Sequence, residues 1–332
     1  MENPSIQIRV ATAGEALIDL VARNDQLFAP CAGGAVYNLT RALALQGTGT
    51  AYLNPLSGDR FGRLLTDGLR EAGVRLAQAA PVAEPTSLAV VALDAAGKPE
   101  YAFYREGVAD RAVSAESLIA GTRAQAGLQA VCTGCLALAP EDRERYLPWL
   151  QACRAQGLLV VVDANLRPSV VADANAYRDS VRAALAQADV LKASDDDLAL
   201  LLPDMADPVA AARALFALSP ARLVALTRGA EGASLLARDG RIWTARETAA
   251  LDVVDTVGAG DCFLAGLLSE LLGEEGAARV NVHEITDGEA RRILARGIAS
   301  ASFCVQRQGC VPPSQSEVRQ WLARGSVVFD AS

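Results

Sequence analysis

The sequence predicts an α/β protein with a mostly parallel central sheet and helices on both faces of that sheet. Short apolar runs rich in β-branched residues alternate along the chain with longer segments of helical periodicity. The run 158–162, Leu-Leu-Val-Val-Val, is uniformly apolar, as expected of a strand that is covered on both faces. Such a strand belongs in the middle of a sheet that lies between two layers of helices.

The individual elements follow from the same two periodicities. Strands are predicted at 6–12, 51–56, 130–133, 158–163, 190–193, 223–227, 233–237 and 242–245. Helices are predicted at 35–46, 61–72, 114–126, 141–156, 175–187, 208–218, 259–272 and 289–306. The polar stretch 274–287 is expected to be a surface excursion and not a domain boundary.

One region departs from the alternation of strands and helices. Residues 87–94, a turn at 95–98 and residues 100–105 are typical of a β-hairpin without a crossover helix, so we expect a small β piece outside the main sheet. Tyr101, Phe103 and Arg105 share one strand face because side chains alternate. An aromatic surface beside a cation suits a sugar face, and an ordinary half-exposed hairpin is the alternative.

Composition excludes several classes of function. The chain has 332 residues, of which 51% are hydrophobic and 21% charged, an ordinary globular balance that can bury a sizeable core. With a formal net charge of −8 and no run of Lys or Arg, nucleic acid is not an expected partner. No segment approaches the roughly 18 apolar residues of a membrane span, and residues 1–10 lack the apolar region of a signal peptide. A cytoplasmic protein with no membrane partner is expected.

Cysteine and histidine usage argues against thiol and triad chemistry. Cys132 and Cys135 form the only CxxC, but no second pair and no nearby His completes a metal site, so free buried thiols are expected. The only histidine, His283, lies in a polar stretch and is expected to be solvated, which sets aside hydrolase triads. The seven cysteines are Cys31, Cys132, Cys135, Cys153, Cys262, Cys304 and Cys310.

The most informative stretch is 255–261, Asp-Thr-Val-Gly-Ala-Gly-Asp, which we place between the end of a strand at Val253 and Val254 and the start of a helix. Gly258 and Gly260 lack a Cβ, so backbone N–H groups there can approach an anion at a helix N-terminus. The helix dipole should hold Asp261 ionised. A carboxylate beside a bound phosphate can accept a proton from an attacking alcohol, which suggests phosphoryl transfer to a hydroxyl. The alternative is an ordinary capped turn, and neither GxGxxG nor GxxxxGK[ST] occurs in the chain.

Three further loops carry polar residues where open α/β sheets bind ligands. Asp19, at the end of the segment 14–19, could accept hydrogen bonds from sugar hydroxyls, and Asn38, in the helix after Gly33 and Gly34, offers both a donor and an acceptor. Asn165 and Arg167 follow the most buried strand and could hold a hydroxyl and a phosphate. The segments 192–195 and 227–232 follow two more strands and could serve a nucleotide. Each of these loops, taken singly, could also be purely structural.

In this order the pieces resemble the ribokinase family, the phosphofructokinase-B type sugar kinases, and within it bacterial fructokinases. Residues 33–47 match the N-terminal signature of the family, and 255–267 match its C-terminal signature. The segments expected between them are 58–62, 163–168 and 227–232, and the fructokinase-like details are 14–19, 101–111, 163–169 and 192–195.

The resemblance implies a three-layer ribokinase-like fold in a single domain, 1–332, with β-lid segments around 13–32 and 86–111. It implies ATP- and Mg²⁺-dependent phosphorylation of a sugar hydroxyl, with fructose as the expected acceptor. A 2-keto-3-deoxygluconate kinase, a nucleoside kinase and a non-catalytic sugar-sensing homologue are the alternatives. By the same carry-over Asp261 is the base, and the N–H groups of Gly258, Ala259 and Gly260 form an anion hole.

The remaining site residues are also predicted from the resemblance and from their positions in the loops described above. The sugar site is expected at Asp19, Gly33, Gly34, Asn38, Asn165 and Arg167, closed by Phe103 and Arg105. The nucleotide site is expected at Lys192, Asp195, Thr227, Gly229 and Gly232. Asp255 and Thr256 would form a monovalent-cation site, for K⁺, and lids of this family often pair into a homodimer. Lys192 stands where the family often has Asn.

Overall fold

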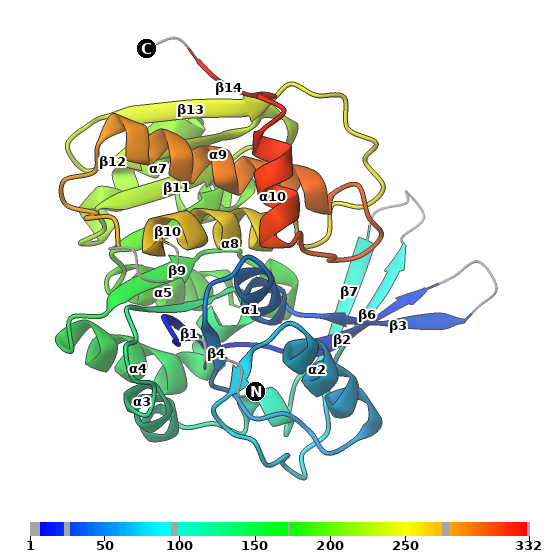
Figure 1. The fold of residues 1–332 in the computed structure, drawn as a ribbon. Helices are drawn as coiled ribbons and strands as arrows, with labels where there is room; N and C mark the ends of the chain where they lie inside the picture. Colours follow the sequence, from blue (N-terminus) through cyan, green and yellow to red (C-terminus); the bar gives the residue numbers. More distant parts are fainter. Residues whose placement is uncertain (1–6, 23–26, 94–98, 172, 274–278, 331–332) are drawn as a thin grey trace.

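The computed structural model describes residues 7–22, 27–93, 99–171, 173–273 and 279–330. A ten-stranded sheet has the order β14-β13-β12-β11-β10-β9-β8-β1-β4-β5 (Figure 1). The pairs from β5 to β11 are parallel, and those from β11 to β14 are antiparallel. The predicted fold class, a mostly parallel sheet between helical layers, is confirmed.

The strands of this sheet are β1 (Val10–Thr12), β4 (Thr50–Tyr52), β5 (Arg75–Leu76), β8 (Ala130–Gly134), β9 (Leu159–Asp163), β10 (Val190–Ser194), β11 (Leu223–Thr227), β12 (Ala233–Ala237), β13 (Ile242–Glu247) and β14 (Val327–Phe329). The helices are α1 (Ala35–Leu45), α2 (Arg60–Glu71), α3 (Ala115–Arg123), α4 (Arg143–Ala155), α5 (Ala174–Leu185), α6 (Asp195–Leu201), α7 (Pro208–Leu218), α8 (Ala259–Leu272), α9 (Asp287–Cys304) and α10 (Gln315–Leu322).

The central strand β9 shows why the sheet is covered on both faces. Val160 and Val162 pack into one hydrophobic core with residues of helices α3 to α7. Leu159 and Val161 point to the opposite face and pack into a second core with residues of α1, α8 and α9. The uniformly apolar sequence of the strand thus supplies both cores, because alternate side chains leave opposite faces.

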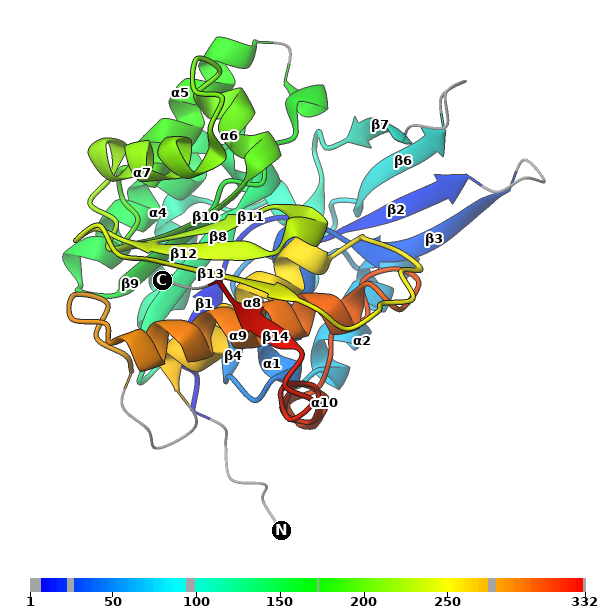
Figure 2. The same cartoon turned by 90° about the horizontal axis from the view of Figure 1, so that it is seen from above.

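A second, four-stranded sheet projects from the body of the molecule (Figure 2). It has the order β3-β2-β6-β7, from β2 (Leu17–Ala22), β3 (Phe28–Gly33), β6 (Ser87–Leu93) and β7 (Pro99–Tyr104). The predicted hairpin is the antiparallel pair of β6 and β7, and its predicted turn at 95–98 lies outside the described residues. The segment after β1, expected to be β structure, supplies β2 and β3.

Several element predictions were wrong at their ends or missed an element. The strand predicted at 6–12 forms only from Val10, with residue 6 outside the described range, and the strand at 51–56 ends at Tyr52. Val253 and Val254 do not end a strand; they lie in an irregular, exposed segment. The edge strands β5 and β14 and the short helices α6 and α10 were not predicted, because such short elements do not establish a hydrophobic period. The capping boxes of α6 and α10 at Ser194 and Ser314 were the available signals.

The thiols and the single histidine largely match expectation. His283 is exposed, and none of the seven cysteines, all of which are described, forms a disulfide; Cys31 is exposed and Cys310 half-buried, whereas the other five are buried. Among the described residues, no helix combines the length and the hydrophobicity needed to cross a membrane.

Candidate active site

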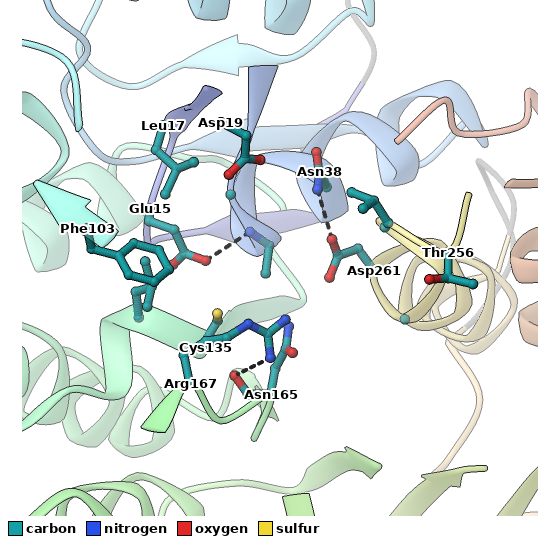
Figure 3. Close-up of a pocket in the computed structure, with 16 residues that line it drawn as sticks. Glu15, Leu17, Asp19, Asn38, Phe103, Cys135, Asn165, Arg167, Thr256 and Asp261 are labelled. Atoms are coloured by element: carbon teal, nitrogen blue, oxygen red, sulfur yellow. Dashed lines mark hydrogen bonds between the residues drawn. The ribbon is translucent and has the colours of Figure 1, made fainter. Parts of the chain in front are cut away.

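Two cavities adjoin each other at the N-terminus of α8. The first has a volume of about 300 Å³ and a polar lining, and Figure 3 shows its residues. The second has a volume of about 520 Å³ and a mainly apolar lining. Thr256 and Gly260 line both cavities, so the predicted anion-binding loop separates two compartments.

The loop before α8 has a backbone that glycine permits. Gly258 has φ +77°, and a Cβ there would lie 2.2 Å from Cys310 Sγ, so only glycine fits. The Asp255 carboxylate accepts hydrogen bonds from the N–H groups of Val257 (3.0 Å) and Gly309 (2.9 Å), which fixes the start of the loop. The N–H of Ala259 donates to the Thr256 carbonyl at 3.2 Å and is therefore engaged inside the turn.

Asp261 lies in the first turn of α8 and faces the first cavity. Its side chain is 7% exposed, and Asn38 Nδ2 donates to Asp261 Oδ2 at 3.0 Å (Figure 3). Burial raises the pKa of Asp261 to about 6, against the opposing effects of Lys192, Asn38 and Arg167. Desolvation outweighs the groups that favour ionisation of this carboxyl. The carboxylate is still mainly ionised at neutral pH, with a pKa suited to a general base.

Lys192 supplies positive charge beneath the loop. Its Nζ lies 3.0 Å from Asp163 Oδ1, and a Cβ on Gly260 would lie 2.9 Å from the same Nζ. Burial raises the pKa of Asp163 to about 7, and the Lys192 ammonium opposes this shift. Lys192 lines neither cavity, so the structure places it under the glycine loop rather than in a nucleotide pocket.

The first cavity brings together most of the predicted sugar-site residues. Burial raises the pKa of Asp19 to about 6. Gly33 lies outside the lining but makes room for this carboxylate, since a Cβ there would lie 2.1 Å from Asp19 Oδ2. Gly34 has φ +101°, a conformation that favours glycine, where the chain enters α1. The predicted residues that line this cavity are Asp19, Gly34, Asn38, Phe103, Asn165, Arg167, Thr256, Gly258, Gly260 and Asp261.

Glu15 was missed by sequence reasoning. It lines the same cavity at 2% exposure, and its Oε1 accepts a hydrogen bond from the N–H of Ala35 at 2.9 Å. Burial raises the pKa of Glu15 to about 7. Its position in the segment 14–19 was a signal, but Asp19 alone was singled out there.

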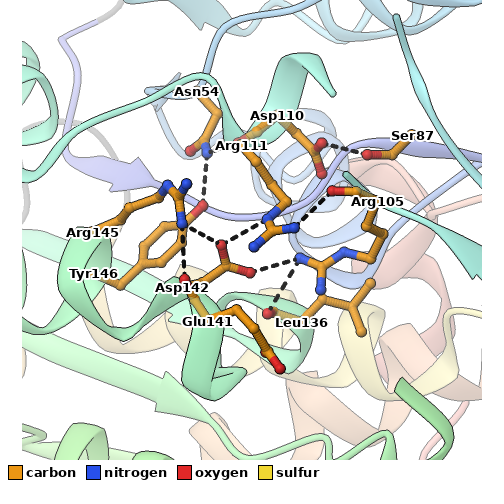
Figure 4. Close-up of polar contacts among 10 residues, drawn as sticks. All are labelled: Asn54, Ser87, Arg105, Asp110, Arg111, Leu136, Glu141, Asp142, Arg145 and Tyr146. Carbon is orange, nitrogen blue, oxygen red and sulfur yellow. Dashed lines mark hydrogen bonds and ion pairs between the residues drawn. The ribbon is translucent and has the colours of Figure 1, made fainter. Parts of the chain in front are cut away.

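Arg105 does not reach the cavity. Its guanidinium is buried, with Nη2 at 3.0 Å from Asp142 Oδ2 and at 3.4 Å from the Leu136 carbonyl (Figure 4). Asp142 is fully buried and also accepts hydrogen bonds from Arg111 at 2.8 Å and Arg145 at 2.9 Å. The expected contact between Arg105 and the sugar is therefore replaced by an ion cluster that ties the end of β7 to the start of α4.

The second cavity contains part of the predicted nucleotide site. Thr227, Gly229 and Gly232 line it, whereas Asp195 and Asp255 line neither cavity. Asp195 instead accepts a hydrogen bond from the adjacent Asp196 N–H at 3.1 Å, at the start of α6. Most of the apolar lining comes from residues that were not among the predicted site residues: Ala249, Leu251, Val253, Phe263, Ile298, Ala301 and Val305.

The chain as a whole is similar to known carbohydrate kinases. The profile of the pfkB family carbohydrate kinases matches residues 7–317. The fructokinase of Rhizobium leguminosarum bv. trifolii is 33% identical over 95% of this chain and 90% of its own length. The structure of a double mutant of Vibrio cholerae fructokinase in a fructose-, ADP- and potassium-bound form has a TM-score of 0.79 at 23% identity, covering 96% of this chain and 100% of that one. That of Salmonella enterica aminoimidazole riboside kinase, complexed with the riboside and an ATP analogue, has a TM-score of 0.77 at 22% identity, covering 95% and 99%.

Proposed function

Because this chain belongs to the pfkB family and is thus an ATP-dependent carbohydrate kinase, we propose that its acceptor is fructose and that Asp261 is its general base. The similarity to the Rhizobium fructokinase supports the choice of fructose. The observation that carries the catalytic assignment is the position of Asp261, whose carboxylate lines the polar cavity beside the loop that separates it from the apolar one.

The two cavities suit the two substrates. Glu15 and Asp19 offer carboxylate acceptors for sugar hydroxyls, and Phe103 offers an aromatic face for the sugar ring. The larger cavity combines an apolar surface for a base with Thr227 and the turn at Gly229 and Gly232. The acceptor hydroxyl and the γ-phosphate would then meet at Gly260.

The chemistry follows from this placement. Asp261 takes the proton of the sugar hydroxyl as the oxygen of that hydroxyl attacks the γ-phosphorus. The bond between the γ-phosphorus and the leaving oxygen of ADP breaks in line with this attack. Asn38 orients the Asp261 carboxylate. Of the three predicted donors, Ala259 is engaged with the Thr256 carbonyl, so the N–H groups of Gly258 and Gly260, with the Lys192 ammonium beneath the loop, stabilise the negative charge of the phosphoryl group in transfer.

Mg²⁺ fits this site as a cation that enters with the nucleotide. Mg²⁺ usually keeps several waters and is held through substrate phosphates, and the junction offers the Thr256 hydroxyl rather than a cage of carboxylates. When bound, it would add positive charge to the phosphates. Asp255 and Thr256 are our candidates for a monovalent-cation site, in keeping with the potassium in the Vibrio cholerae fructokinase structure.

The small sheet is proposed to act as a lid over the sugar, within a single domain, and to pair with a second copy into a homodimer. Exposed apolar side chains on its strands, Val21, Phe28 and Tyr104, support the pairing. We also propose that the enzyme works in the cytoplasm.

The test is ADP release from purified protein with ATP and Mg²⁺ against fructose, ribose, tagatose, 2-keto-3-deoxygluconate and adenosine. We expect turnover on fructose and its loss in Asp261→Asn. Preferred turnover on another acceptor would correct the substrate and keep the reaction. No ADP release with any acceptor would favour a sugar-binding protein without catalysis, and an active Asp261→Asn would overturn the assignment of the base.

A further inference from the structure

Three cysteines from three separate chain segments converge directly behind the anion-binding loop. The Sγ atoms of Cys262, Cys304 and Cys310 all lie within 4.8 Å of one another. Cys262 follows Asp261 in α8, Cys304 is the last residue of α9, and Cys310 lies between α9 and α10. Among the residues that the structure describes, no other group of three His, Cys, Asp or Glu side chains gathers in this way.

The thiol cluster is in contact with the catalytic loop. Cys310 Sγ packs against Gly258, where an added Cβ would lie 2.2 Å from it. Cys304 Sγ lies 3.7 Å from the Val257 carbonyl oxygen. Cys262 and Cys304 are fully buried, while Cys310 is half-buried and leaves a route to solvent. Any change in the spacing of the three sulfur atoms would therefore act on residues 257 and 258.

The spacing suits a soft metal cation. Thiolates select Zn²⁺, Cu⁺ and similar soft cations over the hard cations that oxygen ligands bind. At a Zn–S distance of about 2.3 Å, sulfur atoms around a tetrahedral ion lie about 3.8 Å apart, which the cluster reaches by a contraction of at most about 1 Å. Three sulfur ligands leave a fourth position for water at the Cys310 side.

We propose that Cys262, Cys304 and Cys310 form a binding site for one thiophilic cation, and that its occupancy lowers the rate of phosphoryl transfer. Each thiol that becomes a ligand releases its proton to solvent. The contraction draws Cys310 and Cys304 toward Cys262 and so displaces the backbone at Val257 and Gly258. The inhibitory part rests on the proposed function of this loop, whereas the binding part does not.

Cadmium titration of the intact, reduced protein tests the binding directly, because thiolate coordination gives a charge-transfer absorption in the ultraviolet. We expect one Cd²⁺ per chain in the wild type. Cys304→Ser and Cys310→Ser should each lose at least about 100-fold in affinity, since even a residue outside the ligand shell costs 10–100-fold. The matched control is Cys31→Ser, which removes an exposed thiol and should keep the full signal.

Activity gives the second readout. Cd²⁺ and Zn²⁺ should inhibit sugar-dependent ADP release in the wild type and in Cys31→Ser. The same metal concentrations should not inhibit Cys310→Ser, whose rate should equal the rate of that variant without metal. Absence of the absorption band, or an equal band in both cluster variants, would overturn the site. A band that disappears in the variants without any inhibition would overturn the inhibitory part alone. Failure of the kinase assay itself would count against the proposed function and leave the titration as an independent result.

Discussion

Replacing Asp261 by Asn should lower kcat strongly and at the same time stabilise the fold. The Asp261 carboxyl has a pKa of about 6 in the folded protein against 3.8 as its ordinary value, mainly because it is buried. The folded state therefore holds the proton more tightly than the unfolded chain. Ionisation of Asp261 therefore destabilises the folded state, and this destabilisation grows as the pH rises from about 4 to 6 and is constant above that range.

The size of this effect follows from the shift. A shift of about 2 pKa units corresponds to about 3 kcal/mol near pH 8, at 1.36 kcal/mol per unit, and to about half of that near pH 5. The neutral Asn side chain avoids this cost and can still accept the hydrogen bond from Asn38. Loss of the base should lower kcat by about 10²–10⁴-fold without loss of sugar binding.

Urea unfolding near pH 5 and pH 8 measures the stability, and ADP release measures kcat. The control is Asp67→Asn, an exposed carboxylate on α2, which should change the free energy of unfolding by less than about 0.5 kcal/mol. The reasoning is refuted if Asp261→Asn is no more stable than the wild type near pH 8, or if its gain is equal at the two pH values.

Three further predictions concern the loop, the ion cluster and the sugar cavity. Gly258→Ala should lower the free energy of unfolding by about 1–3 kcal/mol, because φ is +77° and the added Cβ meets Cys310. The same change should affect kcat more than it affects KM for either substrate, and unchanged steady-state kinetics would contradict this. Asp142→Asn should lower the free energy of unfolding by about 3–5 kcal/mol, because it removes the buried anion shared by three arginines. The control is Glu141→Gln at the exposed neighbouring position, which should leave the free energy of unfolding nearly unchanged in the same urea titration. Because burial raises the pKa of Asp19 to about 6, KM for the sugar should rise as the pH falls through 6, in addition to a rise near pH 7 from Glu15 in the same cavity. Asp19→Asn should have a raised KM that keeps only the rise near pH 7, and a rise near pH 6 that persists unchanged in that variant would exclude Asp19 as its cause.

Elements with a strong period could be predicted from the sequence, and the hairpin is an example. β11 and β12 appear at the predicted bounds, and the paired strands β6 and β7 stand outside the main sheet as expected. Two residues of β5 and three of β14 carry no period of their own; they are strands only because a neighbouring strand offers hydrogen bonds. Such edge pairing is a property of the assembled sheet.

The candidate site likewise has residues that could be predicted from the sequence and residues that could not. The glycine loop, Asp261, Asn38 and Asp19 could be singled out from residue types at strand ends and helix starts, and they line one cavity. Phe103 lies on β7 and lines this cavity, but the strand ends at Tyr104, and Arg105 pairs with the buried carboxylate of Asp142 and does not reach the cavity. The alternation of a strand predicts the face on which a side chain lies, but it does not predict the residue with which a charged side chain forms an ion pair.

The sequence by itself determined the α/β class, because this depends on local periodicity, and its motifs, through their resemblance to the sugar kinases, indicated the reaction type and most of the predicted residues that line the first cavity. Only the tertiary structure decided the pKa of Asp261, the place of Lys192 beneath the loop and the meeting of three thiols behind it. Burial and charge pairing depend on residues far apart in the chain, and their energies exist only after the chain has folded around them.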